Sequence, residues 1–143
     1  MLAVEVARGV KQREQAMGLN VMPGPADSAI YAAENGMCIA DDMAGQGIKW
    51  TPADKSPGAR CTGWEALRKR LKAAMTKPGE PMEYPGLFVF DTCRHFIRTV
   101  PTLQRDDKKP DDVDTNAEDH VADEVRYRVL AVRKTAKVLE FRV

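Results

Sequence analysis

The sequence predicts an α/β domain in which a small sheet is flanked by helices. Two patterns indicate this class: amphipathic segments with helical spacing alternate with short apolar runs, and proline and glycine occur where turns between elements are expected. A chain of 143 residues, 43% of them hydrophobic, can bury a core without disulfide or zinc support. The alternation of helices with short strands favours at least some parallel strand pairs.

The first part of the chain is predicted to form a helix, a strand and a second helix. Apolar residues recur at helical intervals over 3–17, which predicts an amphipathic helix. Residues 19–26 follow as a short strand interrupted by two prolines. Asp27 comes next, in the position of an N-cap, ahead of a helix through 29–33 that ends at Gly36. This order places a carboxylate between a strand and a helix.

The middle of the chain adds two strands and two helices. Residues 47–52 form a candidate strand, and a turn-rich loop leads from it to the clearest helix, over 64–75. The sequence Gly-Leu-Phe-Val-Phe at 86–90 predicts a buried strand with Asp91 at its carboxyl end, and a short helix follows around 96–97. The apolar stripe of the long helix consists of Trp64, Leu67, Leu71 and Met75.

The last part of the chain is predicted to be a loop, a helix and a tail. Residues 101–114 lack an apolar period and are typical of a long loop, a kind of segment that is often functional. The sequence Thr-Asn-Ala-Glu at 115–118 matches a capping box and predicts the start of a helix. Residues 138–141 form a candidate edge strand. We therefore assign residues 1–131 to the domain and residues 132–143 to a C-terminal tail or edge strand.

Composition excludes several classes of protein. No run approaches the roughly 18 consecutive apolar residues of a membrane helix, and early charged residues leave no room for a signal-peptide core. Three cysteines that are far apart favour reduced thiols and a cytoplasmic location. The net charge of +1 hides an acidic segment at 106–124, with nine acidic and two basic side chains. Such a segment is either a solvated loop or a source of carboxylates for a cation.

The predicted helix after residue 115 carries two faces of different chemistry. At about 100° per residue, His120, Asp123 and Tyr127 fall on one side and an apolar stripe falls on the other. The polar side is either a cleft lining or a solvated face beside capping acids. Asp27 has two readings as well, because open α/β sheets place sites at strand ends and helices place caps there. Asp91 shares both readings. The apolar stripe comprises Val121, Ala122, Val125 and Val129.

Other patterns that carry chemistry are weak or missing. Cys93 and His95 lack the spacing and the companion pair of a zinc site, and Cys93 is more typical of a small buried residue than of a nucleophile. The sequence contains no Gly-x-Ser-x-Gly elbow, Walker loop or Gly-x-Gly-x-x-Gly fingerprint. A local excess of basic residues favours either contact with nucleic-acid phosphates or a solvated helix face. This set is Arg60, Arg68, Lys69, Arg70, Lys72 and Lys77.

Four short motifs occur along the chain in a characteristic order. They are Pro-Ala-Asp-Ser-Ala-Ile at 25–30, Asp-Lys-Ser-Pro-Gly at 54–58, Gly-Trp-Glu at 63–65 and Asp-His-Val-Ala-Asp-Glu-Val-Arg-Tyr at 119–127. Together they resemble the C-terminal nuclease domain of the terminase large subunits of tailed bacteriophages. The resemblance covers roughly residues 19–131, and its most specific element is the closing Asp-His-x-x-Asp-x-x-Arg-Tyr helix.

This resemblance implies a fold like that of RNase H and the retroviral integrases, and a function in phage DNA packaging. Acidic residues of the family hold two Mg²⁺ or Mn²⁺ ions, which cut double-stranded DNA by activating a water and stabilising the leaving oxygen. Carried over by motif, Asp27 and Asp123 are the catalytic, metal-binding acids, and His120 lies beside the metals. The implied partners are double-stranded DNA and other terminase or portal components in the host cytoplasm, without membrane contact. The candidate phosphate contacts are Lys55, Arg60, Arg68 and Lys69.

The chain also departs from the family's pattern. The family's first metal-binding aspartate lies on an opening strand upstream of the helix at 3–17, and an ATPase motor precedes the nuclease. Neither feature is found in this sequence, so we expect a sheet that is incomplete at the N-terminus and an isolated chain that cuts DNA poorly or not at all. The alternative is a non-catalytic module that docks to DNA or packaging proteins through its basic helix. A third reading is an unrelated α/β domain.

Overall fold

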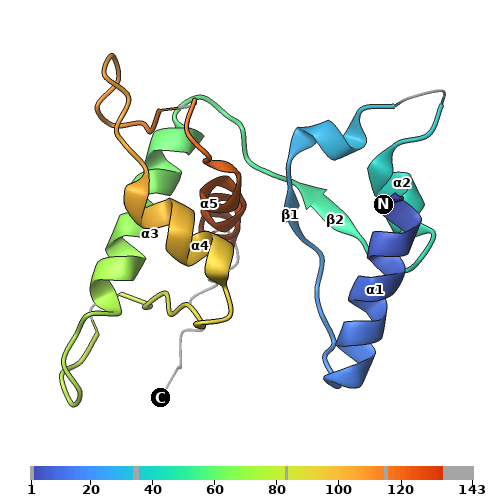
Figure 1. The fold of residues 1–143 in the computed structure, drawn as a ribbon, viewed down its shortest axis with the longest axis horizontal. Helices are drawn as coiled ribbons and strands as arrows, with labels where there is room; N and C mark the ends of the chain where they lie inside the picture. The colour runs from blue at the N-terminus through green and yellow to red at the C-terminus, as the bar shows by residue number, and fades with distance from the viewer. Residues whose placement is uncertain (1, 34–35, 83, 115, 134–143) are drawn as a thin grey trace, which may run out of the picture. The chain divides into compact units, whose positions relative to one another are not determined.

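The structure is a computed structural model, and it describes residues 2–33, 36–82, 84–114 and 116–133 (Figure 1). It is a mixed α/β fold whose contacts divide the chain into two compact units, residues 1–53 (unit 1) and residues 54–143 (unit 2), where the sequence suggested one domain over 1–131. The helices are α1 (Ala3–Ala16), α2 (Ile39–Ala44), α3 (Ala59–Ala73), α4 (Arg94–Thr99) and α5 (His120–Arg133). The strands are β1 (Gly24–Ala26) and β2 (Trp50–Pro52), and two short 3₁₀ helices are η1 (Ser28–Tyr31) and η2 (Val100–Thr102).

Unit 1 confirms the predicted parallel strand pairing. β1 and β2 run parallel with Gly24 opposite Trp50, and the N–H of Ala53 continues the ladder by donating to the carbonyl of Ala26 at 2.9 Å. The small core of the unit lies between α1, α2 and β2, because three apolar side chains are buried there. These are Ala7, Met43 and Ile48. The sequence missed α2, which holds Met43 in this core.

The predicted first helix is confirmed as α1, although its buried residue is not one of those expected. Glu5 accepts a hydrogen bond from the N–H of Leu2 at 3.0 Å, which satisfies one free donor at the helix start. Ala7 is fully buried, whereas Val6 and Met17 are exposed. A small residue at the contact lets α1 lie close to α2.

Asp27 is the N-cap of η1. Its Oδ1 accepts a hydrogen bond from the N–H of Ala29 at 2.8 Å. The helix expected through 29–33 is therefore a single 3₁₀ turn, which the sequence over-extended. Asp27 does follow directly after a strand, as predicted.

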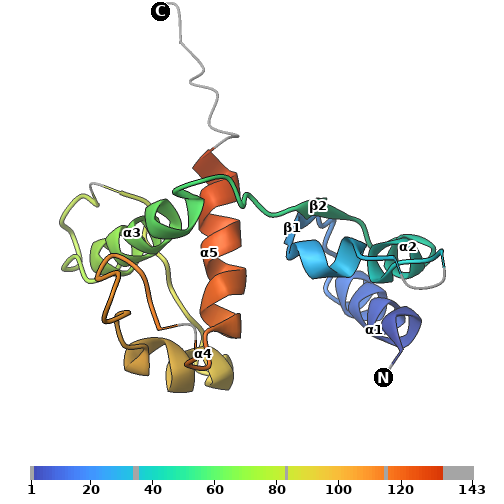
Figure 2. The same cartoon turned by 90° about the horizontal axis from the view of Figure 1, so that it is seen from above.

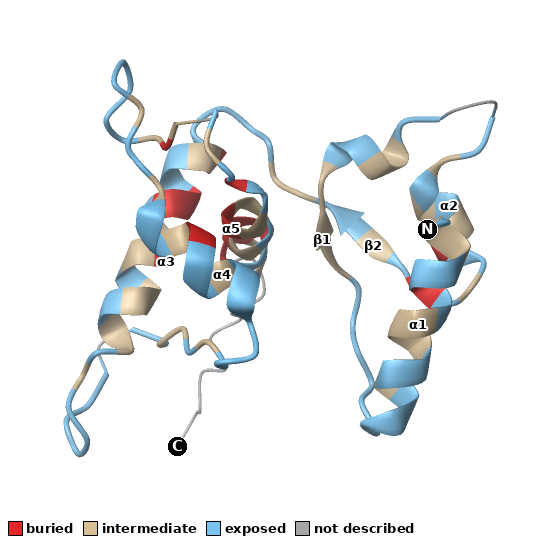
Figure 3. Ribbon diagram, in the orientation of Figure 1, coloured by how far each residue is buried: buried red, intermediate tan, exposed pale blue. Residues whose placement is uncertain are grey.

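Unit 2 is built around the packing of α3 against α5. Figure 2 shows α3 lying across α5, and the buried residues of the unit concentrate between these helices (Figure 3). Trp64 and Leu67 of α3 are buried as the sequence predicted, whereas Met75 lies beyond the end of the helix and is exposed. The core cluster consists of Trp64, Leu67, Val113, Ala122 and Val129.

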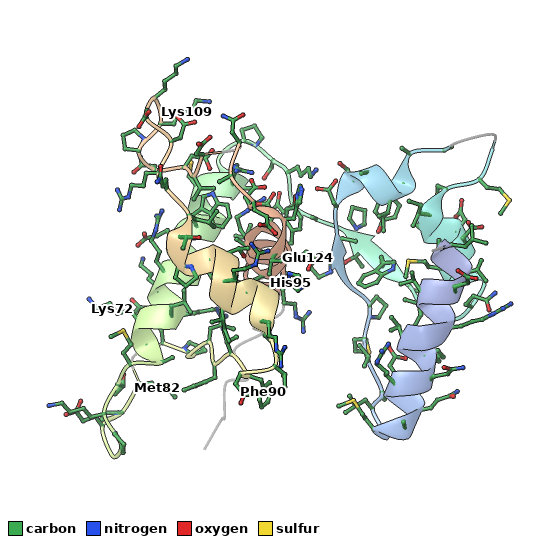
Figure 4. The ribbon with its side chains drawn as sticks, viewed as in Figure 1. Lys72, Met82, Phe90, His95, Lys109 and Glu124 are labelled. Atoms are coloured by element: carbon green, nitrogen blue, oxygen red, sulfur yellow. The ribbon has the colours of Figure 1, made fainter. Side chains whose placement is uncertain are left out.

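The predicted buried strand at 86–90 is wrong. The segment has no strand partner among the described residues, and the N–H of Leu87 donates instead to the carbonyl of Arg70 at 3.0 Å. Leu87 packs against the core of unit 2, but Phe88 and Phe90 are exposed, Phe90 to 80% (Figure 4). Of this apolar run, Leu87 is the residue that packs against the described core of unit 2. The predicted short helix after it is confirmed as α4.

The predicted loop at 101–114 is confirmed and forms a short hairpin. Arg105 and Val113 make an antiparallel bridge, and the N–H of Asp114 donates to the carbonyl of Gln104 at 3.0 Å. At the tip, Asp106 accepts hydrogen bonds from the N–H groups of the two lysines that follow it. Because Val113 is buried in the core, the returning arm of the hairpin holds Asp112 against α3.

α5 begins later than the capping pattern predicted. The helix starts at His120 rather than after 115–118, and Glu118 pairs with Arg98 at 2.8 Å instead of closing a capping box. The start of α5 therefore directly follows Asp119. The candidate edge strand at 138–141 lies outside the described residues. No helix within the described segments is both long and apolar enough to cross a lipid bilayer.

Candidate functional site

Three carboxylates of unit 2 gather around one guanidinium. The Nε of Arg60 donates to Asp112 at 2.7 Å, and its two terminal nitrogens donate to Asp119 at 3.2 Å and Asp123 at 3.4 Å. Trp64 adds an indole N–H bond to Asp112 at 2.8 Å. We call Asp112, Asp119 and Asp123 the acidic cluster. Asp112 comes from the hairpin, and Asp119 and Asp123 come from the start of α5. Arg60 connects both elements to α3.

A second guanidinium completes the arrangement. The Nε of Arg126 donates to Asp123 at 3.0 Å, one helical turn back along α5. The side chain of Arg126 is only 4% exposed and stacks over the ring of Trp64 at 5.1 Å and over that of Tyr127 at 4.5 Å. Lys55 lies 6.0 Å from the centroid of Tyr127. Asp123 is therefore held from two sides by arginines that pack on aromatic rings.

The spacing along α5 explains why these side chains share one face. Asp119 precedes the first residue of the helix, and Asp123 and Tyr127 follow at intervals of four residues, which places them one above another. The backbone N–H of Asp123 donates to the carbonyl of Asp119 at 2.8 Å, so the helical spacing already begins there. The predicted polar face is divided by the fold: Tyr127 is buried and Asp123 is half-buried, whereas His120 is 91% exposed.

Hydrogen bonding dominates the electrostatics of Asp112. Burial alone raises the pKa of this carboxyl, but the bonds from Arg60, the N–H of Val113 and Trp64 outweigh burial and hold the pKa below its ordinary value. Burial likewise opposes the charge of Arg60, yet the bonds to Asp112 and Asp119 and the charge of Asp123 raise the pKa of the guanidinium. Both groups are therefore kept ionised by the contacts between them.

The lowered pKa of Asp112 predicts a loss of stability in acid. A carboxyl whose pKa is lower in the folded than in the unfolded chain stabilises the fold above its ordinary pKa of 3.8, and this contribution fades as the pH falls through the folded value. We expect the unfolding free energy of the Asp112→Asn variant to fall less steeply below about pH 4 than that of the wild type. Urea unfolding followed by tryptophan fluorescence between about pH 3 and pH 7 measures this difference.

Glu118 provides the matched control for that experiment. Its pKa is also lowered, by the hydrogen bonds from Arg98, but both side chains of this pair are more than half exposed. Exposed pairs contribute little to stability, so Glu118→Gln should leave the acid limb close to that of the wild type. Equal flattening by the two variants would contradict a special role for Asp112.

The site residues predicted from the sequence belong to both units. Asp123 lies in the acidic cluster, and Asp27 lies in unit 1 as the cap of η1. His120 is 91% exposed, and its Nδ1 is 3.8 Å from Asp119. Arg60, expected at phosphates, is bonded to three carboxylates. Lys69 faces outward and pairs with Glu65 at 3.3 Å, while Arg68 is half-buried.

Sequence reasoning missed three members of the site. Asp112 stands out only as one of nine acids in the acidic segment, and Asp119 and Arg126 occur in the closing motif without a role of their own. The spacing of residues 119, 123 and 126 by four and three is the signal that could have found the last two, because such residues share one helix face. Nothing in the sequence alone identifies Asp112, since only the hairpin carries it to α3.

The acidic cluster is compensated within the protein. Two guanidiniums neutralise most of the charge of its three carboxylates, and within the described segments no group of three or more His, Cys, Asp or Glu side chains is arranged to hold a metal ion. As arranged here, the described residues of unit 2 do not fit a two-metal centre. No protein-family model, curated protein or solved structure matches the chain.

Proposed function

We propose that this chain is part of the nuclease domain of a phage terminase large subunit and that it acts on double-stranded DNA during genome packaging. The observation that carries the proposal is that the motif residues Asp119, Asp123 and Arg126 form one interior network, joined by Arg60 of α3. Helical spacing alone places these three residues on one face. The support therefore lies in Arg60 and Asp112, which reach that face from α3 and from the hairpin. The RNase H-like fold, the host-cell cytoplasm and the packaging partners belong to the same proposal.

In this proposal Asp27 and Asp123 correspond by motif to the family's acids that bind Mg²⁺ or Mn²⁺, and His120 corresponds to the residue that the family's motif places near those metals. The compensated acidic cluster argues that the isolated chain hydrolyses DNA poorly. The family's first metal-binding acid has no match in this sequence, so activity is expected only of a longer protein that contains both this chain and that acid, which we call the parent protein. The candidate phosphate contacts are Lys55, Arg68 and Lys69, because Arg60 is engaged by carboxylates.

Nicking of supercoiled plasmid by the parent protein tests this proposal. We expect Mn²⁺-dependent nicking that EDTA abolishes, and we expect Asp123→Asn and Asp27→Asn each to reduce nicking to the EDTA level. Asparagine keeps the size and the hydrogen-bond acceptor of both side chains, so the cap of η1 and the bond from Arg126 persist. Loss of activity then reflects the missing charge rather than a lost fold.

Asp111→Asn is the matched control, because Asp111 is an exposed neighbour of Asp112 and lies outside the acidic cluster. This variant should nick DNA as the wild type does. Full activity of Asp123→Asn, with circular dichroism unchanged, would refute the assignment of Asp123.

The second candidate function is a non-catalytic module that binds DNA or packaging proteins. Compensation of the acidic cluster by Arg60 and Arg126 favours it, since a neutralised cluster can serve a purely structural purpose. DNA binding that ignores EDTA, together with an absence of nicking in the parent, would support this module over the enzyme.

A further inference from the structure

Tyr84 stands between two hollows on the outer side of α3. One hollow, of about 680 Å³, is lined by Arg68, Lys69 and Arg70, and the other, of about 400 Å³, is lined by Lys69 and Lys72. Tyr84 and Lys69 line both. Tyr84 as a whole is 53% exposed. An aromatic ring is thus presented to solvent inside a group of cations.

The backbone fixes the segment that carries this ring. The N–H of Leu87 donates to the carbonyl of Arg70, and Leu87 packs against the core of unit 2. Gly86 approaches α3 so closely that an added Cβ would lie 3.2 Å from the Cα of Ala74. Pro85, which lies between Tyr84 and Gly86, has a backbone φ angle fixed by its ring. Tyr84 therefore lies three residues before Leu87, whose backbone N–H is hydrogen-bonded to α3.

The charges around Tyr84 are arranged for an extended anion. Lys72 projects from α3 away from α5 (Figure 4), and four cations within five residues of α3 line the two hollows that Tyr84 also lines. Three carboxylates line the same hollows, and one of them, Glu65, is already paired with Lys69. The remainder of the larger hollow includes Ala66 and Val129, which offer an apolar surface to a flat ring.

We propose that this surface binds single-stranded nucleic acid, with one base stacked on Tyr84 and the adjoining phosphates on Lys69 and Lys72. Aromatic platforms beside cations are how proteins hold unpaired strands without reading their sequence. A duplex keeps its base faces stacked on one another, so Tyr84 can stack only on an unpaired base or a frayed end. The inference rests on the proposed DNA function and adds to it a place for an unpaired strand on α3, the helix whose Arg60 binds the acidic cluster.

Fluorescence anisotropy of a labelled oligothymidylate of about 12 nucleotides, titrated with the full chain in EDTA, tests the inference. We expect Tyr84→Leu to weaken binding about tenfold or more, because leucine keeps apolar bulk but has no π face, and Tyr84→Phe to retain the affinity. Lys69→Gln and Lys72→Gln should each reduce the slope of log K against log salt by about 0.7.

Phe90→Leu is the control, since Phe90 is an exposed aromatic that lines a different hollow. It should bind the oligonucleotide as the wild type does. Unchanged affinity of Tyr84→Leu, or an equal loss in Phe90→Leu, would overturn the inference. A second titration uses a labelled duplex. If wild type and Tyr84→Leu both bind the duplex and neither binds the oligothymidylate, the single-strand inference is overturned while the proposed DNA function is not contradicted. If the chain binds neither the oligothymidylate nor the duplex, the result contradicts the single-strand inference and the proposed DNA function.

Discussion

Replacing Arg60 by Gln is expected to destabilise unit 2 by about 2 kcal/mol. The loss of one partner leaves buried carboxylates uncompensated, which costs about 3–5 kcal/mol for a fully buried pair. Arg60 is 29% exposed, so water takes over part of its role and the expected cost is smaller. Urea unfolding followed by the fluorescence of Trp64 measures the change, in a Trp50→Phe background that removes the second tryptophan.

Two further variants sharpen this prediction. Arg60→Lys keeps the charge but cannot present a planar fork to three carboxylates, so its cost should lie between those of the wild type and Arg60→Gln. Lys69→Gln removes an exposed ion pair on the same helix and should change stability by less than about 0.5 kcal/mol. Equal effects of Arg60→Gln and Lys69→Gln would show that the acidic cluster does not depend on Arg60.

The helices of unit 2 could be predicted where one apolar stripe decided the packing. Trp64 and Leu67 determine the buried face of α3, and both are buried as expected. The helix begins earlier than predicted because Gly58, with φ of 80°, lets the turn at 54–58 lead straight into it. The end of α3 also comes earlier, which leaves Met75 in solvent.

The segment at 86–90 shows that an apolar pattern alone does not determine whether a strand forms. Its apolar run is typical of a strand, but a strand also needs a neighbour, and the identity of that neighbour is not encoded in the run itself. In unit 2 the described neighbour is α3, which accepts only the N–H of Leu87. Phe88 and Phe90 are consequently exposed.

The parts of the candidate site that lie within one helix could be predicted from the sequence, whereas the parts that come from different elements could not. Asp123 and Tyr127 were placed on one face because helical spacing alone decides this. Their solvent exposure was not predictable, because it depends on α3 supplying Arg60 to that face. Asp112 lies on a hairpin, and the bridge between Arg105 and Val113 sets the register of that hairpin. No short-range pattern links that hairpin to α3.

Gly63→Ala is expected to destabilise unit 2 by about 2 kcal/mol, although alanine normally favours a helix. A Cβ at this position would collide with Cγ of Arg126 and would lie 2.9 Å from its Cδ and 3.1 Å from Cδ1 of Leu130. Arg126 cannot move aside freely, because Asp123 and the ring of Trp64 hold it. Two contacts under 3.0 Å place the overpacking at about 3 kcal/mol, the upper end of the usual range, and the gain in helix propensity of about 1 kcal/mol leaves a net cost of about 2 kcal/mol.

The matched control is Gly9→Ala in α1, where the nearest atom to an added Cβ is the flexible end of Arg13 at 3.6 Å. This variant should stabilise unit 1 by up to about 1 kcal/mol, because only the propensity remains. A double-mutant cycle with Arg126→Ala isolates the collision: Gly63→Ala should cost much less once the Arg126 side chain is removed. An undiminished cost in that background would place the strain elsewhere, and a neutral Gly63→Ala would contradict the close approach of α3 and α5 that brings Arg60 to Asp123.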